Sequence, residues 1–442
     1  MFRNNRIRWP IAIVAVLAFV LLNGCMKREA KTVASEESGV TLRIIQSLTN
    51  EPRTEALRDL LDRFEELHPE IKVELLSPGN SVADERIEYA LRDRVGIDVV
   101  EVRDQTLVPL VEQKLLLNLT AYADKWKDYA GLSEDAKHFA SEWDGAVYYI
   151  PNGLYRNQLY YRKDRFDEKA LQVPETWEEL YYTGKRLTNP AKGEYGLAFR
   201  GEEGPDRLLT QLIQDYNGDH VDTLDGMYKL DRSTIFNGIG ARDGALLYKK
   251  LYEELSPPQS VEWSYTEQAD AFANGSVSMM IADAGAIALL NGKLESDNWA
   301  TAPLPVGPQG ISHYAVRGAG WGITSYSSHI KEAWSLIEFL SSPAANEEFG
   351  ERIGVIPIYP RDASFLQSGP YASFWMMDQN EEQYVRTQPP SHYYDYSIFY
   401  KQGKDQARRY LDGDITVEEL LKDLDDFWRK ERTNGKAQAY SP

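Results

Sequence analysis

The stretch TLRIIQSLTNEPRTEALRDLLDRFEELHPEIKVELL, residues 41–76, decides the fold of the chain. It begins with the strand-like run TLRIIQS and ends with a second such run, IKVELL. Between Arg53 and His68, apolar side chains recur every three or four residues, as they do on the buried face of a helix. Pro69 follows and cannot continue a helix. We therefore predict a strand, a helix and a strand in this order.

The same alternation continues along the chain. Residues 83–94 have helical spacing and 97–102 (IDVVEV) form a third strand-like run, which predicts a parallel α/β sheet with a ligand near the carboxyl ends of its strands. Further helices are predicted at residues 106–113, 120–129, 177–187, 205–216, 238–254, 265–273 and 330–340. Further strands or extended segments are predicted at 143–150, 158–161, 276–282, 301–308, 318–324 and 352–360.

Three extended segments indicate that the chain passes between two lobes. Pro151-Asn152-Gly153 interrupts the strand-like residues on either side of it, which makes it a suitable crossing point. The other two segments, 301–305 and 355–357, also contain proline. Because a few residues in such segments can absorb changes in φ and ψ, we expect two rigid lobes that close on each other.

The composition excludes several classes of protein. The 442 residues are 43% hydrophobic and 12% aromatic, which is enough to build folded cores and excludes a disordered chain. The 68 acidic and 49 basic side chains give a net charge of −19, with the basic residues scattered, so we expect no nucleic-acid partner. Cys25 is the only cysteine, which excludes an intrachain disulfide and a cysteine-ligated zinc site.

The N-terminus has the features of an export signal. Arginines precede the apolar run 11–22, which has the length of a signal-peptide core and is too short to span a bilayer. The following LNGC motif, ending at Cys25, resembles the lipobox at which a bacterial lipoprotein is cleaved and its new N-terminal cysteine is acylated. We expect residues 1–24 to be removed and 25–39 to form a lipidated tether at the membrane. A buried free thiol behind an uncleaved anchor is the alternative.

No motif for catalysis or metal binding stands out. The six histidines are isolated from one another along the sequence, which argues against a zinc site built from paired histidines. Neither the Gly-x-Ser-x-Gly elbow of hydrolases nor the P-loop of nucleotidases occurs. We therefore expect no metal ion and no cofactor.

Aromatic and polar side chains are instead frequent next to turns and strand ends. Aromatic rings pack against the C–H faces of sugar rings, and polar side chains hydrogen-bond the hydroxyls, a combination that suits polyols in a cleft. The aromatic candidates are Trp143, Tyr155, Trp263, Tyr265 and Trp321, and the polar candidates are Asn50, Glu51, Asp104, Gln105, Asn152 and Asp283. Core packing is the alternative for each aromatic residue, and a solvated loop position is the alternative for each polar one.

Several motifs, taken in their order, resemble those of the family 1 extracellular solute-binding proteins of ABC importers, the maltose-binding-protein-like group. They are LYYRKD (159–164), VPETWEEL (173–180), FANGSVSMM (272–280), APLP (302–305), GWGI (320–323), the helix from Ala333 to Pro343, and GVIP (354–357). Where members often carry Gly-x-Trp after the methionine-rich strand, this chain has Gly285-Ala286-Ile287.

The resemblance implies a type II periplasmic-binding-protein-like fold, with two α/β lobes that are each a sheet flanked by helices and are joined by hinge strands. Residues 40–150 with 303–350 would form the N-terminal lobe, and 151–302 with 351–442 the C-terminal lobe. A carbohydrate, most suitably an oligosaccharide, would bind in the cleft, with Trp321 at a position that commonly stacks on sugar.

The resemblance also implies a monomeric, lipid-anchored protein that delivers sugar to the permease subunits of an importer and catalyses no reaction. Two alternatives remain open. One is a secreted glycoside hydrolase in which Asp283 or Glu51 serves as acid or nucleophile. The other is a surface receptor that uses the same fold.

Overall fold

The computed structural model describes residues 39–79, 82–141, 143–202, 205–359, 367–393 and 395–433. The predicted signal peptide, Cys25 and the predicted tether as far as Ser38 lie outside the described residues. Within the described ranges, every helix is too short or too polar to span a bilayer.

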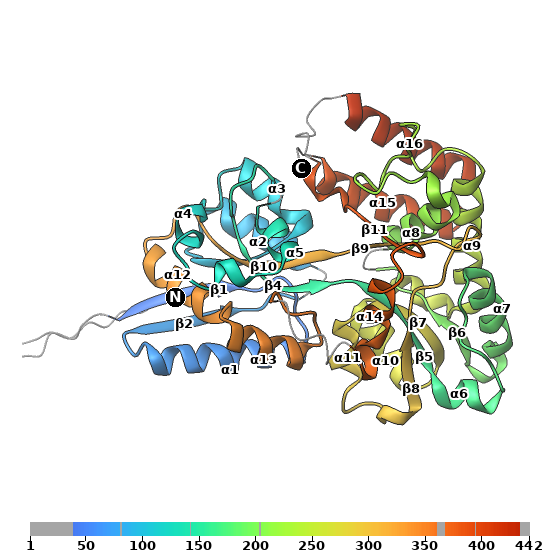
Figure 1. Ribbon diagram of the computed structural model, residues 1–442, viewed down its shortest axis with the longest axis horizontal. Coiled ribbons are helices and arrows are strands. Elements are labelled where there is room, and N and C mark those ends of the chain that lie inside the picture. Colours follow the sequence, from blue (N-terminus) through green and yellow to red (C-terminus); the bar gives the residue numbers. More distant parts are fainter. Residues whose placement is uncertain are drawn as a thin grey trace, which may run out of the picture. The chain divides into compact units, whose positions relative to one another are not determined.

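A five-stranded sheet organises the first lobe, called the N-lobe (Figure 1). Its strands are, in spatial order, β2 (Ile71–Leu76), β1 (Val40–Ile45), β3 (Val99–Arg103), β10 (Arg317–Ile323) and β4 (Ile150–Tyr155). Strand β1 is parallel to β2 and β3, whereas β10 is antiparallel to β3 and β4. The helices are α1 (Glu51–Leu67), α2 (Ala83–Arg92), α3 (Asp104–Glu112), α4 (Thr120–Ala123), α5 (Glu134–Ala140), α12 (Ile330–Leu340) and α13 (Pro343–Ile353). The predicted parallel strand-helix-strand order is confirmed.

A four-stranded sheet organises the second lobe, called the C-lobe (Figure 1). Its strands are, in spatial order, β6 (Tyr195–Ala198), β7 (Val277–Asp283), β5 (Asn157–Arg162) and β8 (Trp299–Ala302). Its helices are α6 (Lys163–Glu168), α7 (Trp177–Leu187), α8 (Pro205–Asn217), α9 (Ile239–Leu255), α10 (Tyr265–Ala273), α11 (Gly285–Leu290), α14 (Ala372–Asp378), α15 (Tyr396–Leu411) and α16 (Val417–Thr433). The predicted architecture of two sheets flanked by helices is confirmed.

Each sheet has a hydrophobic core on both faces, because successive side chains of a strand point to opposite sides. In β1, Ile44 belongs to one core cluster of the N-lobe and Ile45 to the other. In β7, Met279 and Met280 divide in the same way between the two clusters of the C-lobe. The central strands therefore bury apolar side chains on both faces, and their ends are the parts available for a ligand.

A small parallel sheet of β9 (Ser312–Ala315) and β11 (Tyr384–Thr387) contacts both lobes. The backbone N–H of His313 on β9 donates a hydrogen bond to Asp215 Oδ1 of α8 at 2.5 Å, and the ring Nδ1 of His313 lies 3.1 Å from the same oxygen. Arg386 on β11 forms an ion pair with Asp135 of α5. The small sheet thus connects the C-lobe to the N-lobe beside the main crossings.

The crossing between the lobes differs from the prediction. Strand β4 runs through Pro151-Asn152-Gly153 without interruption, and the chain leaves the N-lobe sheet at Arg156, between β4 and β5. Proline is tolerated in β4 because β4 is an edge strand of the sheet. Pro151 pairs with Gly320 of β10, and the pairing of the two strands shifts in register directly beside this pair. Ile356 forms an isolated bridge with Leu154, so the predicted segment 355–357 does lie at the crossing.

Candidate ligand-binding site

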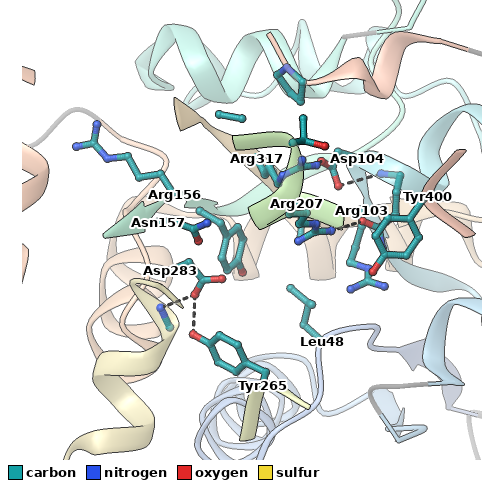
Figure 2. Close-up of a pocket in the computed structure, with 18 of the residues that line it drawn as sticks. Leu48, Arg103, Asp104, Arg156, Asn157, Arg207, Tyr265, Asp283, Arg317 and Tyr400 are labelled. Carbon is teal, nitrogen blue, oxygen red and sulfur yellow. Dashed lines mark hydrogen bonds and ion pairs between the residues drawn. The ribbon is translucent and has the colours of Figure 1, made fainter. Parts of the chain in front are cut away.

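A cavity of about 590 Å³ lies between the lobes and is lined from both of them (Figure 2). Tyr155 and Asn157, on either side of the crossing residue Arg156, are among its lining residues. The volume falls within the range of about 300 to 1,000 Å³ that is usual for small-molecule sites. A ligand in this cavity would contact both rigid bodies at their junction.

The N-lobe wall is built where strands end. β3 ends at Arg103, and the next two residues, Asp104 and Gln105, begin α3 and line the cavity. Arg317, the first residue of β10, donates from Nη1 to Asp104 Oδ2 at 2.7 Å and to the Tyr396 hydroxyl at 3.0 Å. Because Tyr396 begins α15, this arginine joins the two lobes across the cavity.

A buried ion pair between Arg53 and Glu101 supports the N-lobe wall. Glu101 Oε2 accepts hydrogen bonds from the N–H groups of Ser47 at 2.8 Å and Leu48 at 2.9 Å, and Oε1 accepts from Asn152 Nδ2 at 2.7 Å. Burial alone would raise the pKa of Glu101, but the Arg53 charge and the hydrogen bonds outweigh it and hold the pKa below its ordinary value. The carboxylate is therefore charged, and both of its oxygens accept hydrogen bonds from groups inside the protein.

Asn50 and Tyr155 line the cavity, and both contact Arg53 of this ion pair. Asn50 Oδ1 caps α1 by accepting a hydrogen bond from the Arg53 backbone N–H at 3.0 Å. Arg53 Nη1 donates to the Tyr155 hydroxyl at 2.9 Å and so fixes the ring at the edge of the cavity. Burial raises the pKa of Tyr155 to about 12, so the hydroxyl keeps its proton at neutral pH.

The C-lobe contributes Asp283, the last residue of β7, and Tyr265, the first residue of α10. The Tyr265 hydroxyl donates to Asp283 Oδ1 at 2.7 Å, and the Gly285 N–H donates to the same oxygen at 2.9 Å. Burial, together with the neighbouring Asp283, raises the pKa of Tyr265 well above its ordinary value. Asp283 is thus an oriented hydrogen-bond acceptor beside an aromatic ring.

Helix α8 supplies a second cross-lobe contact. Arg207 Nη2 donates to Gln105 Oε1 at 2.9 Å, and the guanidinium lies 5.4 Å from the centre of the Tyr400 ring. Figure 2 shows Asp283 and Tyr265 on one side of the cavity and Arg207 and Tyr400 on the other. The site therefore has an acceptor side and a cationic side.

Residues 50–347 match the model of the bacterial extracellular solute-binding proteins, which covers well over half of the chain. The chain belongs to this family. The matched region includes four of the five N-lobe strands, the β4–β5 crossing and the whole C-lobe sheet, and so contains cavity-lining residues of both lobes.

Two curated relatives and one solved structure extend the comparison. A putative binding protein of Brucella abortus (strain 2308) is 23% identical over 274 residues, which cover 60% of this chain and 63% of that protein. This chain thus spans less than two thirds of that relative. The multiple sugar-binding protein of Streptococcus mutans is 24% identical over 361 residues, covering 75% of this chain and 78% of that protein.

The solved structure is that of maltose-bound MalE3 from T. maritima. It superposes with a TM-score of 0.77 at 20% sequence identity and covers 88% of this chain and 99% of that one. This likeness shows that the solute-binding protein has the type II periplasmic-binding-protein fold. The two sheets flanked by helices, expected from the sequence, are those of this fold.

The structure brings six of the predicted site residues together on the cavity of this solute-binding protein. They are Asn50, Asp104, Gln105, Tyr155, Tyr265 and Asp283. All of them follow a strand or begin a helix, or end the strand that leads to the crossing. That they contact a ligand stays a prediction.

The structure places the other five predicted site residues elsewhere. Trp143 is 8% exposed in an N-lobe core, Trp263 packs half-buried against a C-lobe core, and neither lines the cavity. Asn152 is buried and binds Glu101, and Glu51 is exposed outside the cavity lining. The lining therefore lacks Glu51, one of the two carboxylates considered for a hydrolase.

Trp321 is the most consequential correction. Its side chain is 1% exposed and packs in an N-lobe core, and it is not among the residues that line the cavity. The flanking glycines do not expose it. A Cβ at Gly320 would lie 2.0 Å from the Ile150 carbonyl oxygen, which shows that Gly320 allows β10 to approach β4 closely. The register shift between Ala319 and Gly320 separates the cavity-lining start of β10 from its buried end.

Several lining residues were not predicted from the sequence. The basic and aromatic ones among them include Arg103, Arg200, Arg207, Arg317, Tyr396 and Tyr400. Arg103 could have been found, because it ends the third strand just before Asp104. Tyr396 and Tyr400 lie on α15, a helix that the sequence did not predict, so no local pattern pointed to them.

Within the described ranges, no three His, Cys, Asp or Glu side chains are grouped so that they could hold a metal ion. The curated relatives and the structural neighbour are binding proteins.

Proposed function

We propose that this solute-binding protein captures a carbohydrate outside the cytoplasmic membrane and delivers it to the permease subunits of an ABC importer. The observation that carries the proposal is the inter-lobe cavity, which is lined from both sides by tyrosines and by oriented hydrogen-bonding side chains. The names of the S. mutans protein and of maltose-bound MalE3 state carbohydrate ligands, which supports the same class of ligand here. The cavity volume suits an oligosaccharide.

Capture would proceed by lobe closure. Because the polar groups come from both lobes, a ligand satisfies more of them when the lobes are together and shifts the population toward the closed form. We retain the predicted lobes, 40–150 with 303–350 and 151–302 with 351–442, as a proposal. The first boundary moves to Tyr155, since β4 pairs within the N-lobe sheet.

In the same proposal the protein is a monomer held at the outer face of the membrane by lipid on Cys25, with residues 25–39 as its tether. It acts without catalysis, since the importer supplies the energy of transport. Nucleic acid is no partner, because the chain carries a net charge of −19.

Isothermal titration of the purified protein against neutral and acidic mono- and oligosaccharides tests the proposal. At least one should bind, and Asp283→Asn should weaken that binding by about tenfold or more, since a charged hydrogen-bond acceptor is lost. Asp270→Asn is a matched control, because Asp270 is a half-exposed residue of α10 that pairs with Lys293 and does not line the cavity. If no carbohydrate binds to the folded protein, the proposal is wrong.

A further inference from the structure

The cavity wall is basic although the protein is acidic. Among the described lining residues there are six arginines and two lysines, against five aspartates and glutamates. The whole chain has a net charge of −19, so acidic side chains outnumber basic ones in the protein as a whole. The fold has concentrated cations where the ligand would lie.

Most of these cations are already neutralised by protein carboxylates. Five pairs account for them: Arg53 with Glu101, Arg103 with Asp84, Arg156 with Asp378, Arg317 with Asp104, and Lys404 with Glu202. Lys401 is exposed to solvent. Arg200 and Arg207 remain, and neither has a carboxylate partner among the described residues. Both are only partly exposed and line the C-lobe wall.

The buried polar atoms of the wall that lack a hydrogen-bond partner are likewise all of one kind. Where the structure is described, three cavity-lining side chains have a buried polar atom without a partner, and each atom is an N–H donor: Arg156 Nε, Arg207 Nε and Gln211 Nε2. Arg207 and Gln211 are four residues apart on α8 and so share one face of it. No buried acceptor of the lining is left unpaired in the same part of the chain. The wall lacks acceptors, which an anionic ligand would supply.

We propose that the carbohydrate is acidic, a saccharide with a carboxylate that Arg207 and Arg200 bind; this inference rests on the proposed function. A guanidinium in a cavity costs least when an anion is bound to it, and its planar fork matches a carboxylate. Asp283 lies on the same wall and has no ion-pair partner among the described residues. Its negative charge offsets one of the two positive charges of Arg200 and Arg207 and leaves a surplus of about one positive charge. A monoanion therefore fits better than a phosphate dianion.

Asp283 also fixes the orientation of such a ligand. Its carboxylate repels the anionic group and accepts hydrogen bonds from hydroxyls, whereas Arg207 lies on the other side of the cavity (Figure 2). Arg200 lies 5.1 Å from the centre of the Tyr265 ring and also lines a small cavity together with Arg207, so the two cations are neighbours on the C-lobe wall. The acid end of the sugar would therefore point toward Arg207 and its hydroxyls toward Asp283.

Titrations with matched acidic and neutral saccharides test this inference on the purified protein. The pairs are digalacturonate and its dimethyl ester, cellobiouronic acid and cellobiose, and glucose 6-phosphate and glucose. We expect a uronate to bind at least tenfold more tightly than its neutral partner. Arg207→Gln should weaken uronate binding by about ten- to a hundredfold and remove most of this preference, and Arg200→Gln should do so to a smaller extent.

The control is Arg242→Gln, because Arg242 is half-exposed on α9, pairs with Glu418 and does not line the cavity. It should leave uronate affinity unchanged. If neutral saccharides bind as tightly as acidic ones, or the phosphate sugar binds best, the inference is wrong while the proposed function stands. If no saccharide of either kind binds, the proposed function fails and this inference fails with it.

Discussion

Glutamine in place of Glu101 should destabilise the protein strongly although it nearly preserves the shape of the side chain. The Glu101 side chain is 0% exposed and that of its partner Arg53 is 4% exposed. The variant leaves the Arg53 charge buried without a counter-charge, and its amide NH₂ faces the donors of Arg53 or Asn152 instead of accepting from them. Breaking a buried ion pair by removing one partner costs about 3 to 5 kcal/mol. We expect Glu101→Gln to lower the free energy of unfolding by this amount.

The matched control lies in the same sheet. Arg43 and Glu74 form an ion pair at 2.8 Å between β1 and β2, with side chains that are 48% and 49% exposed. An exposed pair of this kind contributes at most about 1 kcal/mol, so Glu74→Gln should change the stability little. Urea unfolding at pH 7, followed by circular dichroism, compares the two variants. Equal losses of less than about 1 kcal/mol in both would refute the argument that burial makes the first pair important.

The pH dependence of the free energy of unfolding tests the same ion pair independently. The pKa of Glu101 is lowered in the folded protein from an ordinary value of 4.5. Its contribution to stability is therefore fully present above pH 4.5 and is lost as the pH falls through the folded-state pKa. The stability difference between the wild type and Glu101→Gln should shrink as the pH is lowered below about 4.5. A difference that stays constant down to pH 3 would contradict the pKa shift.

Three further outcomes are expected. Cys25→Ser should abolish metabolic labelling with palmitate and release the protein from the membrane fraction. Trp321→Ala should lower the free energy of unfolding by about 3 to 5 kcal/mol, as large-to-small changes in a core do, and leave the ligand affinity of the folded protein within a factor of about three. Small-angle scattering should show a smaller radius of gyration with the saccharide that binds than without it; an unchanged curve at saturation would contradict lobe closure.

The parts of the fold that the sequence predicted are those with complete local signals. Helices α7 and α10 have the predicted bounds, and each begins with a capping box, at Thr176 with Glu179 and at Ser264 with Glu267. The predicted break at Pro151-Asn152-Gly153 was wrong because its cause is not local. These residues remain in a strand since β10, more than 150 residues later in the chain, pairs with them.

The candidate site also contains residues with a local sequence signal, which were predicted, and others whose position depends on distant parts of the chain. Asp104, Gln105 and Asp283 were found because the carboxyl ends of strands are a local landmark that the topology turns toward the cavity. Trp321 was misjudged because glycines on either side of it suggested exposure. The contact that requires Gly320 is with the Ile150 carbonyl of a neighbouring strand, and no window of sequence contains both.

The charge of the cavity shows most clearly what only the fold determines. The sequence has aromatic and polar side chains next to turns and strand ends, and this pattern favoured a neutral polyol as ligand. Folding pairs most of the cavity cations with carboxylates and leaves Arg200 and Arg207 without one among the described residues, on a wall whose unpaired buried atoms are donors. Charges on the outer surface are screened beyond about 8 Å at physiological ionic strength, so the net charge acts weakly on a ligand inside the cavity. Recognition there depends on the few groups within hydrogen-bonding distance, and these favour an anion.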